Sequence, residues 1–397
     1  MKKDFNYHLF FLVVFLVGFS FLFFACLSAS ESMQKFGNTN YYLFHQLFFG
    51  LLPAIILGLI AYKISLAFVK KWAPLLVLLN IVALFIVFLP GIGVNAGGAS
   101  RWISFGGLTV QPSEFLKVSA ILYLSAWIAS KLSETQGKDW KTITKKGYHN
   151  LIYIFVPFIV FLGLITSALL VQRDLSTLGI ISITLLVLYF SAKTPLWHTL
   201  ALLASGAIIC LFFIKFEPYR ANRLLIFLHP DKDPLGIGLQ LRQSLISLGS
   251  GGIFGKGLGM STLKSILPMS MSDSIFAIIG EEIGAIGCIT LIALFIYFFW
   301  LGIKIARNSS DRFSQMVAVG IVFWITFQAF INMSSVAGIF PLAGIPLPFF
   351  SYGGSHLAAE LIGVGLLLNI SKNTGRYYLQ GAEPADTLCH LWQLSGS

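Results

Sequence analysis

One aspartate stands where a long apolar segment begins, in a setting that suits acid–base chemistry. Asp273 lies in MSDSIFAIIGEEIG, directly before the apolar residues that start near position 274. A carboxylate held within hydrogen-bond reach of a hydroxyl group can accept its proton. The alternative is that Asp273 caps the following helix, with Ser272 competing for that position. The residues alone leave both interpretations open.

Two opposite charges lie inside another apolar segment. Glu114 and Lys117, in QPSEFLK, are three residues apart, so they share one helix face and can pair. Such a pair can snorkel to the membrane surface, or it can shape a polar cavity inside the membrane. We expect the cavity. Glu281, Glu282 and Glu360 are further acidic residues in apolar surroundings, and the sequence gives them no role.

Several cations are candidates for binding an anionic headgroup such as a pyrophosphate. Arg101 stands beside Trp102 in GGASRWISF, where it could anchor the chain at an interface or offer its guanidinium to a phosphate. A second group lies in one long segment, where a solvated surface is the alternative interpretation. Its members are Arg220, Arg223, Lys256 and Lys264.

The glycine-rich run at 249–259 does not form a nucleotide-binding loop. Gly257 follows Lys256, where the phosphate-loop pattern needs Ser or Thr. The cysteines Cys26, Cys210, Cys288 and Cys389 have no metal-binding or redox spacing. The sequence therefore identifies no cofactor, and a divalent cation, Mg²⁺ or Mn²⁺, stays open as an aid to a pyrophosphate leaving group.

The composition places these residues in a membrane. The 397 residues are 56% hydrophobic and only 11% charged, whereas soluble domains carry about 25% charged residues. This balance excludes a disordered chain, a disulfide-rich secreted module and a cytosolic enzyme. A span needs about 20 apolar residues. Ten spans are expected, at 8–28, 42–61, 73–90, 112–130, 150–170, 177–192, 197–215, 274–303, 314–333 and 354–371.

The positive charges orient the chain. The net charge is +11, and in the short loops Lys and Arg gather on one side if both termini are cytoplasmic. We therefore expect an all-α membrane domain over 1–372 and a disordered cytoplasmic tail over 373–397. The segment 216–272, between spans seven and eight, is then a large extracytoplasmic loop. Within it, residues 239–248 are expected to form an interfacial helix. Asp174, in QRDLST, is expected to be a helix N-cap.

Several motifs in one order resemble the SEDS family. They are ASRWISFGGLTVQPSEFLK, QRDLST, PYRANRLLIFLHPDKDPLGIGLQLRQSLISLGSGGIFGKGLG, SDSIFAIIGEEIG and INMSSVAGIFPLAGIPLPFFSYGGS, and the resemblance covers about residues 8–372. Members such as FtsW, RodA and SpoVE are ten-span glycosyltransferases. The resemblance implies polymerisation of lipid II, an undecaprenyl-pyrophosphate-linked disaccharide-pentapeptide, into peptidoglycan at the outer face of the bacterial cytoplasmic membrane. GKGLGMSTLK is closer to the FtsW and SpoVE branch, so septal synthesis is expected ahead of RodA-type elongation.

The resemblance also implies roles for individual residues. Asp273 matches the essential acid and would be the general base; partial burial would raise its pKa from the reference value of about 3.9. The residues expected to bind substrate are Arg101, Trp102, Glu114, Lys117, Tyr219, Arg220, Arg223 and Lys264. Expected partners are a class B penicillin-binding protein, which is a transpeptidase, other divisome or elongasome membrane proteins, and membrane lipid. No nucleic acid is expected.

The chain departs from the family pattern at several positions, and two other functions stay open. QRD replaces a QPD-type turn, and His356 and Glu360 stand where small or apolar residues are usual. One alternative is a lipid II flippase with no chemistry; another is a scaffold that only recruits the transpeptidase. Because transporters concentrate their sites near the bilayer midplane, an acid at the outer mouth of a span favours chemistry.

Overall fold

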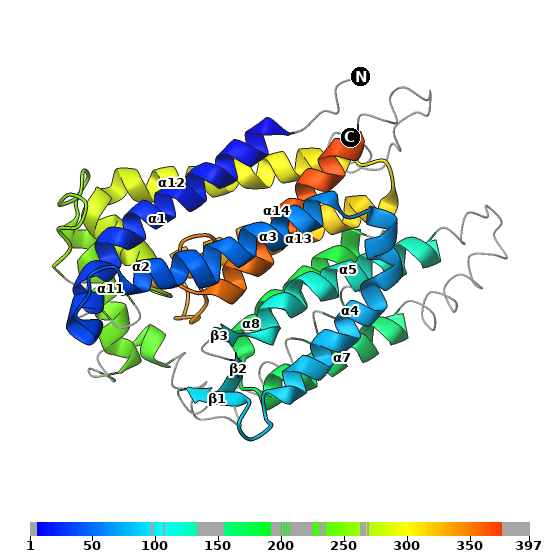
Figure 1. The fold of residues 1–397 in the computed structure, drawn as a ribbon, viewed down its shortest axis with the longest axis horizontal. Helices are drawn as coiled ribbons and strands as arrows, with labels where there is room; N and C mark the ends of the chain where they lie inside the picture. The colour runs from blue at the N-terminus through cyan, green and yellow to red at the C-terminus, as the bar shows by residue number, and fades with distance from the viewer. Residues whose placement is uncertain are drawn as a thin grey trace.

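The chain forms a bundle of long helices with one small sheet (Figure 1). The computed structural model describes residues 6–96, 99–105, 108–132, 155–191, 225–229, 236–262 and 270–374, with the single positions 200, 202, 204, 206, 233 and 267. The helices are α1 (Tyr7–Phe36), α2 (Tyr41–His45), the π-helix η1 (Gln46–Leu51), α3 (Leu52–Lys63), α4 (Leu66–Ile86), α5 (Pro112–Leu132), α7 (Val156–Val171), α8 (Leu175–Ser191), α11 (Ile237–Ser250), α12 (Ile275–Arg307), α13 (Arg312–Val336) and α14 (Gly354–Thr374).

Six helical segments of the described residues are long and apolar enough to cross a membrane. They are α1, the continuous α2–η1–α3 unit, α4, α12, α13 and α14. α7 and α8 are apolar but shorter. The class of protein predicted from the composition is thus confirmed. The predicted span 197–215 lies outside the described residues except for isolated positions, so the total of ten spans stays a prediction.

The position predicted for the third span is wrong. The span predicted at 73–90 begins instead at Leu66, where the Ser65 hydroxyl accepts a hydrogen bond from the backbone N–H of Phe68 at 3.3 Å and caps α4. The helix ends at Ile86, before the chain turns into the sheet. At the other end of the chain, α14 ends at Thr374, and the boundary between the membrane domain and the tail stays a prediction. The remaining tail residues lie outside the described part.

The segment before α5 is a three-stranded antiparallel sheet, so the all-α prediction is wrong here. β1 (Gly93–Ala96), β2 (Ala99–Phe105) and β3 (Leu108–Val110) pair in the order β1–β2–β3. The signal was in the sequence: paired glycines at 97–98 and 106–107 separate short runs that contain β-branched and aromatic residues. That pattern is typical of consecutive β-hairpins.

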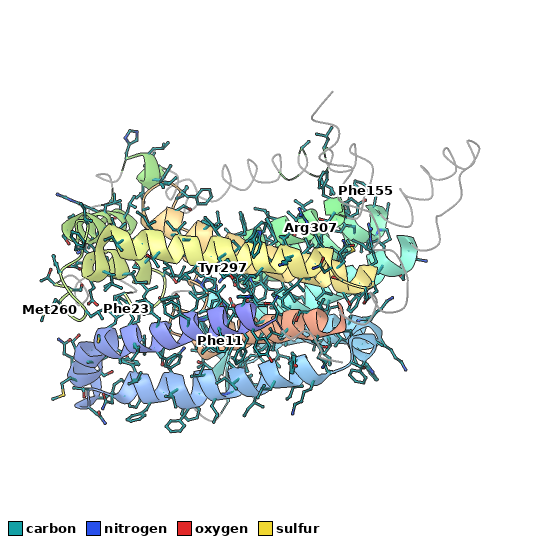
Figure 2. All side chains as sticks on the ribbon, turned by 90° about the horizontal axis from the view of Figure 1, so that it is seen from above. Phe11, Phe23, Phe155, Met260, Tyr297 and Arg307 are labelled. Atoms are coloured by element: carbon teal, nitrogen blue, oxygen red, sulfur yellow. The ribbon has the colours of Figure 1, made fainter. Side chains whose placement is uncertain are left out.

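α13 and α14 form the centre of the bundle. Of their most apolar stretches, 72% and 83% are buried in protein, against 17% in the α2–α3 unit. α14 packs along α3, and α13 packs along α12, α5 and α8. Large apolar side chains on the outer helices are exposed instead, among them Phe11 on α1 and Tyr297 on α12, which are labelled in Figure 2. Exposed apolar surface on this scale suits contact with lipid.

The connections gather at two opposite ends of the bundle (Figure 1). The sheet end carries β1–β3, the turn between α7 and α8, α11, the start of α12 and the loop after α13. The opposite end carries the start of α1, the α3–α4 and α12–α13 turns and the end of α14. Asp273 lies at the sheet end, directly before α12.

Candidate active site

The turn that carries Asp273 is held by hydrogen bonds to three consecutive carbonyl groups. The carbonyl of Met271 accepts from the backbone N–H of Tyr352 at 2.8 Å, and that of Ser272 accepts from the Ser351 hydroxyl at 2.6 Å. The carbonyl of Asp273 itself accepts from Asn332 Nδ2 at 2.8 Å. The backbone under the half-buried carboxylate is therefore placed by α13 and by the loop after it.

Asp273 is not the N-cap of α12, because it lies one residue before the N-cap position. α12 begins at Ile275 with Ser274 at the N-cap position, so neither Asp273 nor Ser272 occupies it. The Ser274 hydroxyl accepts a hydrogen bond from Gln240 Nε2 of α11 at 3.1 Å. The helix predicted at 239–248 is thus confirmed as α11, and it packs against α12 beside this turn.

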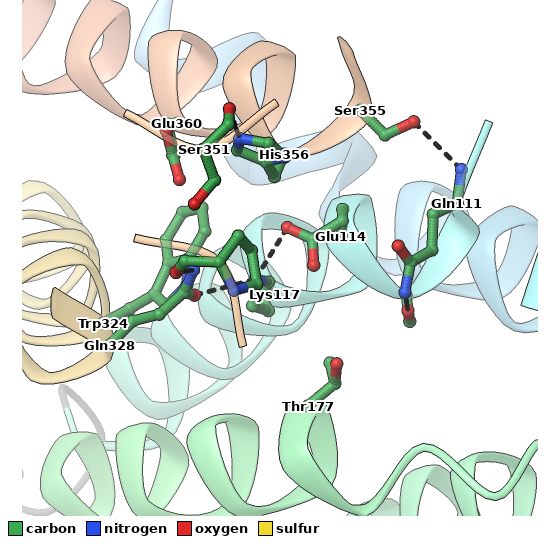
Figure 3. A network of polar contacts seen from close by, with 12 residues as sticks. Gln111, Glu114, Lys117, Thr177, Trp324, Gln328, Ser351, Ser355, His356 and Glu360 are labelled. Atoms are coloured by element: carbon green, nitrogen blue, oxygen red, sulfur yellow. Dashed lines mark hydrogen bonds and ion pairs between the residues drawn. The ribbon is translucent and has the colours of Figure 1, made fainter. Parts of the chain in front are cut away.

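Glu114 and Lys117 form a buried ion pair rather than a snorkelling one. Lys117 Nζ lies 2.7 Å from Glu114 Oε2, and the two side chains are 3% and 4% exposed. The ammonium also donates a hydrogen bond to Gln328 Oε1 at 2.9 Å and lies 5.1 Å from the ring centroid of Trp324 (Figure 3). These partners on α13 supply the polar contacts that a buried charge needs.

One loop connects the ion pair to the Asp273 turn. Gln328 Nε2 donates to the carbonyl of Pro346 at 3.0 Å, and Asn332 Nδ2 donates to that of Ile345 at 2.8 Å. Ser351, farther along the same loop, bonds to Ser272 of the Asp273 turn. The structure therefore links the Glu114–Lys117 pair and Asp273 through α13 and loop 345–351.

His356 and Glu360, the two unusual residues of α14, both support that loop. His356 Nε2 lies 2.8 Å from the carbonyl oxygen of Ser351, and Glu360 Oε2 accepts from the backbone N–H of Phe349 at 2.8 Å. Phe349 has a φ of 65°, a conformation rare for an aromatic residue. Figure 3 shows both side chains on the face of α14 that points toward the ion pair. Glu360 thus has a structural partner that the sequence did not reveal.

Tyr352 ties the same loop to the N-terminal helices. Its hydroxyl lies 2.8 Å from His45 Nδ1 of α2, and its ring stacks on Phe24 of α1. Burial raises the pKa of Tyr352 to about 12, so the hydroxyl stays protonated at neutral pH. The loop is therefore anchored from α1, α2, α13 and α14.

The glycine-rich run and the residues after it supply the hydrogen-bond partners of Glu281 and Glu282. α12 is interrupted at Gly284, which has a φ of 76° and a ψ of −168°, and residues 251–262 dock against this break. Glu281 Oε1 accepts from Lys256 Nζ at 2.7 Å and from the Thr262 hydroxyl at 2.9 Å. The carboxylate of Glu282 accepts from the backbone N–H groups of Gly259 and Ser261. Lys256 thus already has a compensating carboxylate within the protein.

Arg101 contacts the turn between α7 and α8. Its Nε donates to the carbonyl of Gln172 at 3.4 Å, and its Nη2 donates to that of Arg173. Trp102 lies opposite Val94 in the sheet and is half-buried. These contacts hold the sheet to the helices, and binding of substrate by Arg101 and Trp102 stays a prediction.

The N-cap predicted at Asp174 is confirmed. Asp174 Oδ1 accepts from the backbone N–H of Thr177 at 3.3 Å, at the start of α8. Its Oδ2 accepts from the Ser113 hydroxyl at 3.0 Å, and Gln111 Nε2 also approaches it at 3.5 Å. The cap therefore also joins α8 to the start of α5, where the ion pair lies.

Four predicted site residues cannot be placed relative to Asp273. Tyr219, Arg220, Arg223 and Lys264 lie outside the described residues. Within the described part, no group of three His, Cys, Asp or Glu side chains is arranged to hold a metal ion. Assistance by a divalent cation stays a prediction.

Comparison of the sequence with models of known protein families shows which family this chain belongs to. Residues 7–376 match the FtsW/RodA/SpoVE family of cell cycle proteins. The chain belongs to this family. The resemblance inferred from the motifs is thereby confirmed, and it covers nearly the whole membrane domain.

Relatives within the FtsW/RodA/SpoVE family point to two of its branches. A probable peptidoglycan glycosyltransferase FtsW from Trichlorobacter lovleyi is 35% identical over 364 residues, which cover 91% of each chain. The stage V sporulation protein E of Bacillus subtilis is 40% identical over 309 residues, covering 76% of this chain and 80% of the relative. This agrees with the branch that the glycine-rich run favoured.

Solved structures share the fold. A chain of a peptidoglycan synthase complex described as coordinating polymerization and crosslinking aligns with a TM-score of 0.74 at 23% identity, covering 94% of this chain and 98% of that one. The rod shape determining protein RodA of Thermus thermophilus aligns with a TM-score of 0.64 at 22% identity, covering 93% and 97%. At these identities the likeness concerns the fold alone.

Proposed function

We propose that this protein is a peptidoglycan glycosyltransferase that polymerises lipid II into glycan strands, with Asp273 as the general base. Membership of the family and the names of the FtsW relatives support the reaction class. One structural observation carries the choice of residue: the turn 271–273 is held at three consecutive carbonyl groups, so the Asp273 carboxylate starts from a well-defined backbone position. Positioning of this kind is what general-base catalysis requires.

The reaction needs one proton transfer and one leaving group. The acceptor sugar hydroxyl gives its proton to the Asp273 carboxylate while its oxygen attacks the anomeric carbon of the donor sugar. The bond from that carbon to the pyrophosphate oxygen breaks, and undecaprenyl pyrophosphate leaves with the bonding electron pair. Cations near the leaving group would stabilise this developing charge. Arg101, Arg220, Arg223 and Lys264 remain the candidates.

The charges of the two ends support an extracytoplasmic position for Asp273. The positive-inside rule assigns the end with more Lys and Arg to the cytoplasm. At the end opposite the sheet lie Lys63, Lys70, Lys71, Lys131, Lys304, Arg307, Arg312 and Lys372. The described cations toward the sheet end, apart from the buried Lys117, are Lys35, Arg101, Arg173, Arg242 and Lys256. We therefore place both termini in the cytoplasm and the sheet end outside.

Septal cell-wall synthesis is the favoured cellular role, in the bacterial cytoplasmic membrane at the division site. The relatives named FtsW support this role ahead of RodA-type elongation. A class B penicillin-binding protein is the proposed partner, because the aligned synthase complex is described as coordinating polymerization with crosslinking. A fluorescent fusion should gather at the division plane; an even distribution along the side wall would favour elongation instead.

The flippase alternative is weakened by the partners of the buried acids. In that hypothesis Glu114, Lys117, Glu281, Glu282 and Glu360 would line a headgroup pathway. Instead, Glu281 and Glu282 hold the glycine-rich loop and Glu360 holds the backbone of Phe349. These carboxylates are engaged in structural contacts within the protein.

Reconstitution with lipid II separates the three functions. The purified protein, with a class B penicillin-binding protein whose transpeptidase serine is blocked, is placed in vesicles containing fluorescent lipid II. The proposal expects glycan strands of many disaccharides. Translocation of lipid II without polymer would support the flippase, and the absence of both activities with an active positive-control polymerase would support the scaffold.

A further inference from the structure

An apolar groove lies between α1, α3 and α14, away from the Asp273 turn. Its volume is about 410 Å³, and its lining includes Val14 and Gly18 of α1, Ile55 and Leu59 of α3, and Leu361 of α14. The lining side chains are hydrocarbon apart from the Tyr62 hydroxyl. These three helices are all candidates for crossing the membrane, so the occupant must be soluble in the bilayer.

The walls of the groove have a structural origin. α3 and α14 touch through their backbones: a Cβ added at Gly365 would lie 2.2 Å from the carbonyl oxygen of Gly58, and one at Gly58 would lie 2.9 Å from that of Leu361. α1 provides the other wall, and a Cβ at Gly18 would meet nothing within 4 Å. The groove is therefore open where Gly18 faces it. Behind it, α3 and α14 are packed so closely that no side chain fits at Gly58 or Gly365.

Two lysines mark one end of the groove. Lys372 Nζ lies 4.8 Å from the ring centroid of Tyr62, which lines the groove. Lys63 follows Tyr62 in sequence and lines a second groove, of about 470 Å³, that shares Leu59 with the first. Among the described residues, none that lines either groove is acidic. Hydrocarbon along the groove and positive charge at its end match an amphiphile with an anionic head.

The end of α3 is also locked to α14 at this point. Asn369 Nδ2 donates to the carbonyls of Ala61 and Ile64 at 3.0 and 2.6 Å. Lysines in the last turn of a helix complement its dipole whether or not a ligand is present. That explanation accounts for Lys63 and Lys372 but not for the open groove beside them.

We propose that this groove binds one acyl chain of an anionic phospholipid, with the lipid phosphate held by Lys63 and Lys372. The site lies at the end of the bundle opposite Asp273, so the inference does not depend on the chemistry proposed there. A bound lipid would fill the space between α1 and the α3–α14 pair. It would thereby stabilise the folded protein by an amount that rises with the logarithm of the lipid concentration above the dissociation constant.

Lipid-dependent unfolding tests the site. The full-length protein, stripped of lipid in a neutral detergent, is titrated with dioleoylphosphatidylglycerol or with dioleoylphosphatidylcholine while the unfolding temperature is recorded. Because a basic residue near an anionic lipid surface contributes about 1 kcal/mol, two lysines predict about a 30-fold lower dissociation constant for the anionic lipid at low salt. The anionic lipid should therefore give the same rise in unfolding temperature at a concentration about 30-fold lower.

Two pairs of variants separate the charge from the groove. The Lys63→Gln/Lys372→Gln variant should lose the preference for the anionic lipid, whereas Lys70→Gln/Lys71→Gln, which removes the same charge from α4, should keep it. Gly18→Leu, which fills open space in the groove, should weaken binding of both lipids. Gly163→Leu on α7, where a Cβ also meets nothing within 4 Å, should leave both titrations unchanged.

Three outcomes would overturn the proposal. Equal stabilisation of the unmodified protein by both lipids would show that the site does not recognise an anionic headgroup. Equal loss of preference in the two lysine variants would mean that general surface charge attracts the lipid. Undiminished binding in Gly18→Leu, with an unchanged lipid-free unfolding temperature, would place the lipid elsewhere.

Discussion

Gln328 and Asn332 lie one turn apart on α13 and connect the two parts of the candidate site. Gln328 accepts a hydrogen bond from Lys117 and donates one to the carbonyl of Pro346. Asn332 donates to the carbonyls of Asp273 and Ile345. Both amides also hold the loop that follows α13. Displacement of this loop should therefore shift both the ion pair and the Asp273 turn.

Replacing Asn332 by Ala should impair catalysis more than folding. The variant loses two hydrogen bonds to backbone carbonyls, each worth about 1 kcal/mol. It also frees the backbone of Asp273, and misplacement of a catalytic group by about 1 Å can cost about a hundredfold in rate. We expect kcat for lipid II polymerisation to fall by about that factor, with KM nearly unchanged, in a steady-state polymerisation assay.

Asn369→Ala is the matched control for this substitution. Asn369 also donates two hydrogen bonds to backbone carbonyls, at the end of the bundle away from Asp273. Its loss should lower the unfolding temperature by a similar amount and leave kcat intact. Equal loss of kcat in the two variants would show that Asn332 acts through general stability and not through the position of Asp273.

Removing one partner of the Glu114–Lys117 pair should destabilise the protein strongly. Lys117→Met leaves the carboxylate of Glu114 buried without its cation, which typically costs about 3–5 kcal/mol in the free energy of unfolding. The double variant Glu114→Gln/Lys117→Met carries no buried charge and should recover part of that loss. Thermal unfolding in detergent measures both effects.

The pair between Glu31 and Lys35 serves as the control for the buried pair. It has a similar N–O distance, 2.6 Å, but its side chains are 35% and 56% exposed. Exposed pairs contribute little to stability, so Lys35→Met should barely change the unfolding temperature. A loss as large as that of Lys117→Met would show that burial does not set how much these two ion pairs stabilise the protein.

Much of the helical framework could be predicted from the sequence, because a run of about 20 apolar residues is a strong signal of a membrane-spanning helix. The ends were less predictable, since they depend on single groups such as the Ser65 hydroxyl that caps α4. The sheet is harder to predict because its strands are short and lie between spans; the paired glycines at 97–98 and 106–107 are its only strong signal in that segment.

The candidate site was predictable only for residues that stand out by type. Charged residues such as Asp273, Glu114 and Lys117 are conspicuous in an apolar chain. Gln328 and Asn332 are less so, yet two amides four residues apart in an apolar segment were a usable signal for one polar helix face. The partners of Glu360 and Glu281 could not be predicted, because they come from loops that only the folded structure brings near.

The glycine-rich loop should tolerate no side chain at Gly255. This residue has a φ of +79°, and a Cβ would lie 2.2 Å from the carbonyl oxygen of Glu282. Gly255→Ala should therefore lower the free energy of unfolding by at least the roughly 1–3 kcal/mol that such a backbone conformation costs. It should also expose residues 251–262 to limited proteolysis. Gly163→Ala, in open space on α7, should not destabilise the protein, because alanine favours a helix over glycine by about 1 kcal/mol, and it should leave the cleavage unchanged. Cleavage as slow in Gly255→Ala as in the unmodified protein would contradict the docked loop.

The most direct test of the proposed function is Asp273→Asn in the reconstituted polymerisation assay. Asparagine keeps the shape and the backbone carbonyl held by Asn332 but cannot accept the hydroxyl proton. We predict a loss of about 10²- to 10⁴-fold in glycan synthesis, with an unfolding temperature like that of the unmodified protein. Asp311→Asn, at the N-cap of α13, is the matched control and should retain activity. Polymerisation at the unmodified rate by Asp273→Asn would contradict the assignment of Asp273 as the general base.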